Sequence, residues 1–325
     1  MSTTIDCTTG NTDFSLHAGS QIPVPSSIFP RRKKPWRPAV VGKMLWHGFT
    51  HVGTHREVLR LLFSSPPFTE ILFSEPTFAI KYLAQNYLVK GLTIPESSAC
   101  FLHHYKRLQT ALPDSLLRQT LQTDLTLHEI HQDDHCFTVT MGLSRPSYKE
   151  GELSLRLRVN GEIVFILSFT IVPGWVVKSQ AAEILLISRL QGVKGAYPQI
   201  SLATRTLHDV APCALLFSAL KGVADAFGIS EIAAVSADRQ SYYREDSAAA
   251  FQEAYDGFFA ELGIPKSATG FFNIPVPLDA KPLSLIKHGH KLRTKAKRAF
   301  KQQIQLVCAS FFEQLAPNAS HKLPH

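Results

Sequence analysis

Residues 183–237, EILLISRLQGVKGAYPQISLATRTLHDVAPCALLFSALKGVADAFGISEIAAVSA, are the stretch that decides the fold. Residues 183–190 form an apolar run of strand length, and residues 231–236 are almost wholly apolar, as strands buried on both faces are. Between them, Pro212–Phe227 has a helical pattern and stops at Gly228, which suits the left-handed turn that ends helices. Two strands joined through a long polar connection and a helix predict a parallel βαβ unit, whose strand ends are free to build a site.

The pattern of apolar residues changes on the N-terminal side of this unit. From about residue 123 the apolar period is two, and residues 152–159 and 162–172 are strands around the dipeptide Asn160-Gly161. That dipeptide is the strongest short-range hairpin signal, because both residues tolerate positive φ in a tight turn. The polar positions of the first of these strands predict a solvent-facing side: Glu152, Ser154, Arg156 and Arg158.

Four further segments complete the predicted organisation. Residues 1–40 are rich in Ser, Thr and Pro and predict a disordered or extended basic arm, either solvated or in contact with an anionic surface. Residues 41–121 have helical spacing and predict an N-terminal helical layer, followed by an α/β core at 122–282. Residues 283–315 predict a basic amphipathic helix packed on the core, with a tail at 316–325. Its expected apolar stripe is Leu292, Ala296, Phe300, Ile304, Val307, Phe311 and Leu315.

The bulk composition is that of an ordinary globular chain of 325 residues, 45% hydrophobic and 18% charged. No apolar stretch reaches the roughly 18 residues of a membrane-spanning helix. The N-terminus shows no signal-peptide pattern, so we expect a cytoplasmic protein. Five scattered cysteines without a CxxC pair argue against a disulfide framework and a zinc ribbon. The formal net charge of +8 favours partners that carry phosphate, such as nucleic acid, anionic lipid or an acidic coenzyme.

The order hairpin, strand, helix, strand, helix, strand resembles the acyl-coenzyme-A-dependent N-acetyltransferases of the GNAT family. The resemblance implies an α/β (α+β) fold with a GNAT-like mixed sheet, and acyl-coenzyme A as a cofactor. In that family, backbone amides at a helix start hold the phosphates of the coenzyme. Arg189, Gly192, Gly195 and Ala196 approximate the composition of the family's phosphate-binding turn but not its spacing, because about fifteen residues precede the expected helix at Pro212.

A second resemblance covers roughly residues 45–315. Five segments and the basic C-terminal helix carry it, the segments being LQG at 190–192, ATRTLHDVAP at 203–212, LLFSALKGVADAFG at 215–228, AVS at 234–236 and YDGFFAELG at 255–263. Their order and spacing are similar to those of the VirK/YbjX family of Gram-negative bacteria. The resemblance implies roles in virulence, in the display of outer-surface proteins and in resistance to antimicrobial peptides, without a defined reaction. This chain departs from the family pattern after AVS, where Asp238, Arg239 and Gln240 replace a stretch with a histidine.

Polar residues gather around the two strands of the opening unit. Two of them are candidate catalytic residues: His208, because histidine exchanges protons near neutral pH, and Asp238, as a loop carboxylate. An arginine such as Arg205 suits a phosphate or carboxylate. The alternative is that these side chains cap the helix and satisfy loop backbone groups. The candidate ligand-binding residues are Arg189, Gln191, Gly192, Thr204, Arg205 and Ser236.

Two histidine-rich segments resemble metal sites by composition alone. His47, His51 and His55 are spaced by four, but two glycines weaken that helix and no matching acid or cysteine accompanies it. Residues 128–136 contain histidines, aspartates and a cysteine around a strand start, where a polar turn is expected. We therefore predict no metal site in this sequence.

Seven Lys or Arg residues and no acid stand between Lys287 and Lys301. A helix with these cations on one face and Phe or Leu on the other is compatible with three roles. It can lie on an anionic bilayer surface, contact nucleic acid, or pack on the core with its cations in water. No known motif frames nucleic-acid readout here, so we expect none. The candidate membrane or anion-binding residues are Lys291, Arg293, Lys297 and Arg298.

Three functions are compatible with these patterns. The first is a VirK-like factor in virulence and envelope homeostasis, at the inner membrane or in the cytoplasm, whose partners are anionic lipid or outer-surface proteins. The second is a GNAT-like acyltransferase that uses acyl-coenzyme A. The third is a non-enzymatic scaffold or chaperone-like partner protein. The substrate, the reaction and the oligomeric state do not follow from the sequence.

Overall fold

The computed structural model describes residues 42, 46, 49–145, 149–243, 245, 252, 256–278, 282, 284, 286 and 288–315. The described residues all belong to one compact unit of the chain, Gly42–His325. The predictions for the basic arm, 1–40, and the tail, 316–325, lie outside the described residues.

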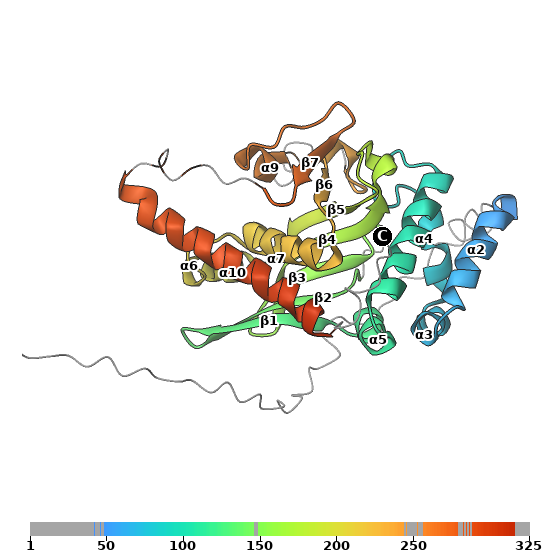
Figure 1. The fold of residues 1–325 in the computed structure, drawn as a ribbon, viewed down its shortest axis with the longest axis horizontal. Coiled ribbons are helices and arrows are strands. Elements are labelled where there is room, and N and C mark those ends of the chain that lie inside the picture. The colour runs from blue at the N-terminus through green and yellow to red at the C-terminus, as the bar shows by residue number, and fades with distance from the viewer. Residues whose placement is uncertain are drawn as a thin grey trace, which may run out of the picture. The chain divides into compact units, whose positions relative to one another are not determined.

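A mixed sheet, seven-stranded in the described part of the chain, forms the centre of the fold, with its strands side by side in chain order (Figure 1). All neighbouring strands are antiparallel except β5 and β6, which are parallel. This confirms the predicted βαβ unit and the mixed α/β class. The strands are β1 (Leu125–Gln132), β2 (His135–Leu143), β3 (Leu153–Val159), β4 (Glu162–Pro173), β5 (Glu183–Gly192), β6 (Glu231–Val235) and β7 (Phe271–Pro275).

Local turn chemistry explains where these strands begin and end. Asn160 and Gly161, between β3 and β4, have φ of 51° and 85°, which confirms the predicted tight hairpin. A second two-residue turn at Asp133 and Asp134, with φ of 49° and 59°, joins β1 to β2. The sequence prediction missed β1, because its polar residues read as part of a turn before a single strand.

The prediction of a long polar connection after β5 was wrong. Residues Tyr197–Thr206 form a helix, α6, which begins directly after the turn that contains Gly195. Pro198 stands in the first turn of α6, where a missing N–H costs nothing. The following helix, α7 (Pro212–Phe227), has the predicted bounds and ends at Gly228 with φ of 68°.

The predicted N-terminal helical layer is present. It consists of α2 (Val52–Leu62), α3 (Pro66–Ser74), η1 (Pro76–Leu83), α4 (Ile94–Ala111) and α5 (Asp114–Gln122). At the start of α4, Thr93 and Glu96 form a reciprocal capping box, which satisfies two helix-end donors. The helical spacing predicted over 41–121 is interrupted after η1, which ends at Leu83, because Asn86 and Leu88 then adopt positive φ.

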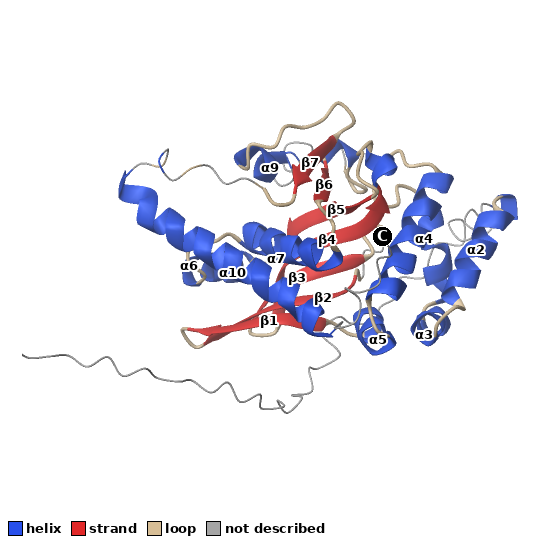
Figure 2. Ribbon diagram, viewed as in Figure 1, coloured by secondary structure: helices blue, strands red, loops and turns tan. Residues whose placement is uncertain are grey.

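Helices cover the sheet from two directions (Figure 2). The α2–α5 layer lies toward one end of the strands, with α4 against β4, while α7 crosses the face of β3 and β4. The C-terminal helix, α10 (Lys291–Leu315), packs against α7, preceded by η7 (His288–His290). Gly222 of α7 permits this contact, because a Cβ there would lie 2.2 Å from the carbonyl oxygen of Gln305. The remaining described helices are η2 (Gly174–Val177), η3 (Ala237–Arg239) and α9 (Gly257–Glu261).

The polar side predicted for β3 does not face solvent. Ser154 and Arg156 are 1% and 3% exposed, and Glu152, just before the strand, is fully buried. Asp124 pairs with Arg156 at 2.8 Å, and residues of the helical layer surround Glu152. The alternation of polar and apolar residues identified the polar side of β3 correctly. Residues distant in the sequence cover that side and exclude solvent from it.

The apolar stripe predicted for α10 is only partly correct. Phe300 and Ile304 are buried, but beyond them the buried residues are Cys308, Ala309 and Phe312, while the predicted Val307 and Phe311 are half-buried. Toward the N-terminus, Leu292 is 84% exposed and Ala296 is exposed. The N-terminal turns of α10 extend beyond α7 (Figure 1). Within the described residues, no helix is both long and apolar enough to cross a membrane.

Candidate functional site

The parallel strands β5 and β6 pair over three residue pairs, of which Ile187–Ala234 is the last. Beyond that pair β5 continues to Gly192, still bonded to β4, with Ser188 as an extra residue opposite the Ser168–Phe169 step. An extra residue bends a strand and increases its twist. The pairing of the two parallel strands thus stops at their carboxyl ends, one residue before β6 itself ends, and open α/β sheets bind ligands at such ends.

The side chain of Gln240 lies against β5 just beyond this last pair. Its Nε2 donates to the carbonyl oxygen of Ser188 at 2.9 Å and to Oε1 of Glu150 at 2.6 Å. The other carboxylate oxygen of Glu150 lies 3.7 Å from Nε of Arg189, a predicted ligand-binding residue. Gln240 is fully buried and Glu150 is 5% exposed. The carbonyl oxygen of Ser188, next to the last β5–β6 pair, is thus satisfied by a glutamine amide from the loop after β6.

That loop, residues 236–243, is fixed by segments distant in sequence. Arg239 donates to the carbonyl oxygen of Lys90 at 3.0 Å and to that of Thr269 at 2.6 Å. The backbone N–H of Lys90 donates to the carbonyl oxygen of Arg239, and the Ser241 hydroxyl donates to the carbonyl oxygen of Asn86. Any chain-like ligand that enters between β5 and β6 has to move this loop, together with Gln240.

Ser236 and Asp238, both predicted site residues, lie together at the start of the same loop. The Ser236 hydroxyl donates to Asp238 at 2.7 Å, and Lys266 donates to the same carboxylate at 2.6 Å. Burial acts to raise the pKa of Asp238, but the bonds from Lys266 and Ser236 outweigh it, so that the pKa lies below its ordinary value. Asp238 is therefore a carboxylate at neutral pH, suited to hold a cation and poorly suited to donate a proton.

The other predicted residues of this region lie on α6 and its flanks. Gly192 packs closely on α6, since a Cβ there would lie 2.9 Å from Ile200. Thr204 bonds back to the carbonyl oxygen of Ile200, while Gln191 and Arg205 are exposed.

The two predicted catalytic residues lie in different surroundings. His208 is exposed, and its ring lies 4.9 Å from the Phe300 ring of α10. Asp238 instead bonds to Ser236 and Lys266. His208 and Asp238 therefore contact different residues, and the structure does not bring them together as a catalytic pair.

Because α6 starts right after the glycine turn, residues 192–196 now directly precede a helix. The first-turn N–H groups of a helix lack intrahelical partners and point along the helix axis toward such a turn. The sequence reading placed the turn some fifteen residues from its helix. The structure removes that objection to phosphate binding at this position.

A second polar group, which sequence reasoning missed, joins the helical layer to the sheet. Glu152 forms an ion pair with Lys81 of η1 and accepts bonds from the hydroxyls of Tyr87 and Tyr105. We call these four residues the buried cluster. Lys81 also donates to the Tyr105 hydroxyl at 3.0 Å and lies 4.4 Å from the centroid of the Phe78 ring.

Burial dominates the protonation of the buried cluster. It lowers the pKa of Lys81, against the opposing effect of the Glu152 carboxylate. Burial and the same carboxylate raise the pKa of Tyr87 well above its ordinary value, so its hydroxyl stays a donor. Nearby, His104 of α4 accepts the N–H of Ile171 at 3.1 Å, and burial holds its pKa well below the usual range. The group has the composition of an active site but full burial, which favours a structural role.

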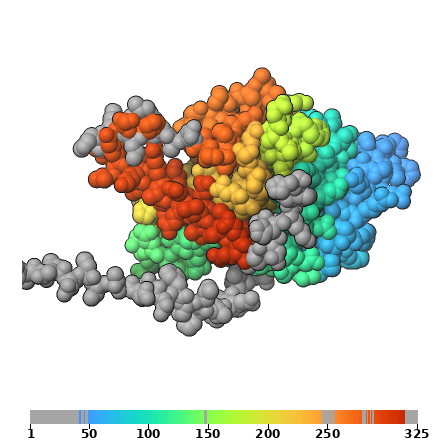
Figure 3. Space-filling view, viewed as in Figure 1, coloured from blue at the N-terminus to red at the C-terminus, as the bar shows by residue number. Residues whose placement is uncertain are grey.

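The predicted anion-binding residues lie on the exposed N-terminal turns of α10. Lys291, Lys297 and Arg298 are partly exposed, and Arg293 forms an exposed ion pair with Asp209 at 2.8 Å. Burial and the like charges of Arg298 and Lys297 lower the pKa of Lys301. Like charges thus crowd together on α10, which lies on the face of the molecule seen in Figure 3.

One comparison with known proteins gives a match. Residues 42–305 match a family model described as a protein of unknown function (DUF535). No curated protein and no solved structure matches the chain. The matched range contains the helical layer, the sheet, the loop after β6 and the basic turns of α10.

Proposed function

The chain belongs to the DUF535 family, which is the VirK/YbjX family that its motifs resemble, and we propose that it is a peripheral factor of the bacterial envelope. In this proposal the N-terminal turns of α10 attach the protein to an anionic membrane surface. The envelope role follows from what the family resemblance implies, namely surface-protein display or antimicrobial-peptide resistance. The attachment rests on the structure of α10.

The observation that carries the proposal is the contrast between packing and charge along α10. The cations Lys291, Arg293, Lys295, Lys297, Arg298 and Lys301 stand in its first eleven residues. The buried contacts with the core begin at Phe300, so the preceding turns are not needed for packing. A leucine that is 84% exposed among cations is the pattern of a helix that dips an apolar side chain into the headgroup region.

The electrostatic contribution is large enough to hold a protein at a membrane. Each Lys or Arg near an anionic leaflet contributes about 1 kcal/mol. Four such residues together therefore correspond to roughly a thousandfold in affinity. The Arg293–Asp209 pair is exposed and worth little, so it does not compete strongly with lipid phosphate.

Charge reversal tests this proposal. The wild-type protein is expected to co-sediment with vesicles that contain phosphatidylglycerol, but not with vesicles of phosphatidylcholine alone. Replacement of Lys291, Arg293, Lys297 and Arg298 by Glu is expected to abolish binding, as is about 1 M salt, where the screening length is roughly 3 Å. Retention of wild-type binding by the fourfold variant, with an unchanged circular dichroism spectrum, would contradict the proposal.

A second candidate function, acyl transfer from acyl-coenzyme A, is favoured by one specific observation. The pairing of β5 with β6 ends at Ile187, and the strand that carries Ser188 runs on into a glycine turn and a helix start. A pantetheine arm, which carries amide groups, is able to take the Ser188 carbonyl bond that Gln240 now makes. Arg189 and the amides before α6 would then face the phosphates.

Calorimetry with acyl-coenzyme A distinguishes this candidate from the first. Binding is expected to strengthen in Gln240→Ala, because the ligand no longer displaces the glutamine from Ser188. The variant Lys194→Glu, which reverses an exposed charge at the turn before α6, is expected to weaken it. No heat at millimolar ligand with either the wild type or Gln240→Ala would exclude the candidate and leave the membrane proposal untouched.

A further inference from the structure

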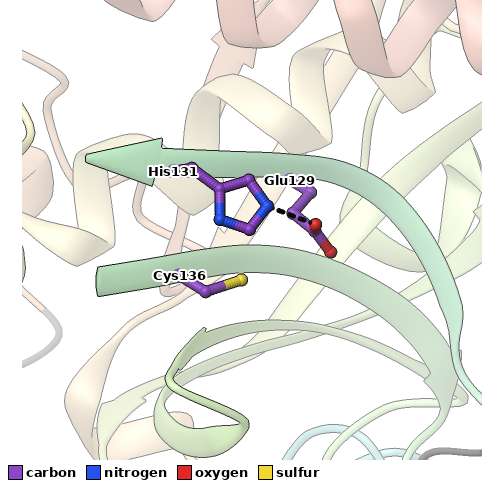
Figure 4. A group of neighbouring side chains, drawn as sticks. All are labelled: Glu129, His131 and Cys136. Atoms are coloured by element: carbon purple, nitrogen blue, oxygen red, sulfur yellow. Dashed lines mark hydrogen bonds and ion pairs between the residues drawn. The ribbon is translucent and has the colours of Figure 1, made fainter. Parts of the chain in front are cut away.

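Three potential metal ligands converge near the tip of the β1–β2 hairpin (Figure 4). They are Glu129 and His131 of β1 and Cys136 of β2, and their ligand atoms all lie within 4.8 Å of one another. Nε2 of His131 and Oε1 of Glu129 are 2.6 Å apart. The group is independent of the loop after β6 and of the basic turns of α10.

Strand geometry brings these side chains to one face. Glu129 and His131 are two residues apart on β1, so they point to the same side of the ribbon. His131 lies directly opposite Cys136 in the register of β1 and β2, where cross-strand side chains are neighbours. The register therefore places all three side chains at neighbouring positions on one face.

The backbone at Cys136 is held by the neighbouring hairpin. Its N–H donates to Oδ1 of Asn160 at 2.9 Å, and its carbonyl oxygen accepts the N–H of Asn160 at 2.8 Å. The turns of both hairpins have the positive φ angles of tight two-residue connections. A shallow hollow of about 450 Å³, lined by residues 131–136 and Asn160, opens beside them and leaves room for an ion with bound water.

From this arrangement we propose a binding site for a divalent transition-metal ion of the zinc class. A thiolate, an imidazole and a carboxylate are the three side-chain ligand types of Zn²⁺, and sulfur disfavours Mg²⁺ and Ca²⁺. Bonds of about 2.0–2.3 Å in a tetrahedron place ligand atoms roughly 3.5 Å apart. The pairs here reach that spacing by small side-chain shifts, with water from the exposed side as the fourth ligand.

Metal binding replaces the proton on the sulfur of Cys136 with a metal–sulfur bond and releases that proton to solvent. It also breaks the bond between His131 and Glu129, which costs little because both side chains are at least half exposed. The metal then ties β1 to β2 at the end of the hairpin farthest from the helical layer.

Cobalt is the most direct probe, because Co²⁺ occupies zinc sites and a thiolate ligand gives an intense near-ultraviolet charge-transfer band. Full-length protein, stripped with a chelator and reduced, is expected to develop this band on titration with Co²⁺ and to lose it when Zn²⁺ is added. Competition with a chromophoric chelator gives the stoichiometry, expected to be one ion per chain, and the affinity for Zn²⁺.

Variants decide whether the band belongs to this site. Cys136→Ser is expected to abolish it, and His131→Ala and Glu129→Gln to weaken Zn²⁺ binding roughly tenfold or more. Two matched controls are expected to leave both readouts unchanged: Cys213→Ser, a partly buried cysteine of α7, and His128→Ala, a neighbour of Glu129 on the opposite face of β1. Absence of the band in the wild type, or its persistence in Cys136→Ser, would overturn the proposal.

Discussion

Charged residues act in two opposite settings in this molecule, the buried cluster and the first turns of α10. In the buried cluster, Lys81 and Glu152 are 3% and 0% exposed, and the carboxylate is enclosed by three donors. On α10, Lys297 and its neighbours crowd like charges together at the surface. The same residue types therefore stabilise the fold in the buried cluster, whereas on α10 they are available to bind a partner.

The difference is one of solvation. A buried charge has lost its water and depends on every partner, so that removal of one partner leaves the other uncompensated. An exposed cation keeps its water and contributes little to folding, yet attracts an anionic surface over about a screening length. Substitutions in the buried cluster should change stability, and substitutions on α10 should change binding alone.

The largest expected effect is that of Glu152→Ala. It removes the carboxylate that pairs with Lys81 and accepts from the hydroxyls of Tyr87 and Tyr105, so we expect a loss of about 3–5 kcal/mol in the free energy of unfolding. Urea denaturation followed by circular dichroism measures it. The control Glu57→Ala removes an exposed partner of Lys106 and is expected to cost less than about 1 kcal/mol. Equal losses in the two variants would show that burial does not distinguish the regions.

The next effect concerns binding and not stability. Lys291→Gln together with Lys297→Gln is expected to weaken binding to anionic vesicles by about 2 kcal/mol, or roughly thirtyfold. The control with the same charge change is Arg56→Gln with Arg60→Gln, on α2 at the other side of the molecule (Figure 1). Neither pair is expected to shift the free energy of unfolding by more than about 0.5 kcal/mol. Equal loss of binding in both would indicate a non-specific charge effect.

A smaller, pH-dependent effect comes from His104, beside the buried cluster. Burial lowers its folded-state pKa well below the ordinary value, so the native protein keeps His104 neutral while the unfolded chain takes up a proton below about pH 6.5. Stability is therefore lost as the pH falls through that value, by up to about 1.4 kcal/mol per pH unit.

His104→Gln isolates that contribution. The glutamine oxygen is able to accept the N–H of Ile171, as the imidazole does, without a titrating group. We expect this variant to show a shallower fall in the free energy of unfolding between pH 6.5 and pH 5. The same slope in both proteins would refute the assignment of a neutral, buried His104.

The elements formed by local patterns were predictable from the sequence. Helix α7 has the predicted bounds because its apolar run ends at Gly228, and the turn at Asn160-Gly161 needs only positive φ. α6 was missed because an exposed helix with few apolar residues resembles a polar connection. β1 was missed because the polar residues of its second half, His128, Glu129 and His131, resemble those of a turn.

The site depended on contacts that no local pattern contains. Gln240 bonds to Glu150 and Ser188, which lie 90 and 52 positions away in the sequence. Alternation correctly assigned Glu152 to the polar side of β3, but the cover of Lys81, Tyr87 and Tyr105 comes from another part of the chain. Sequence periodicity thus indicates which side chains share a face, and tertiary contacts decide whether that face is exposed to solvent.

Tryptophan quenching by brominated lipid tests membrane attachment most directly. Leu292 and Leu306 are both exposed on α10, but only Leu292 lies among the cations. The added fluorescence of Leu292→Trp is expected to be quenched on anionic vesicles with brominated acyl chains, and that of Leu306→Trp is expected to be unaffected. Equal quenching at both positions, or none at Leu292→Trp, would contradict attachment through the N-terminal turns of α10.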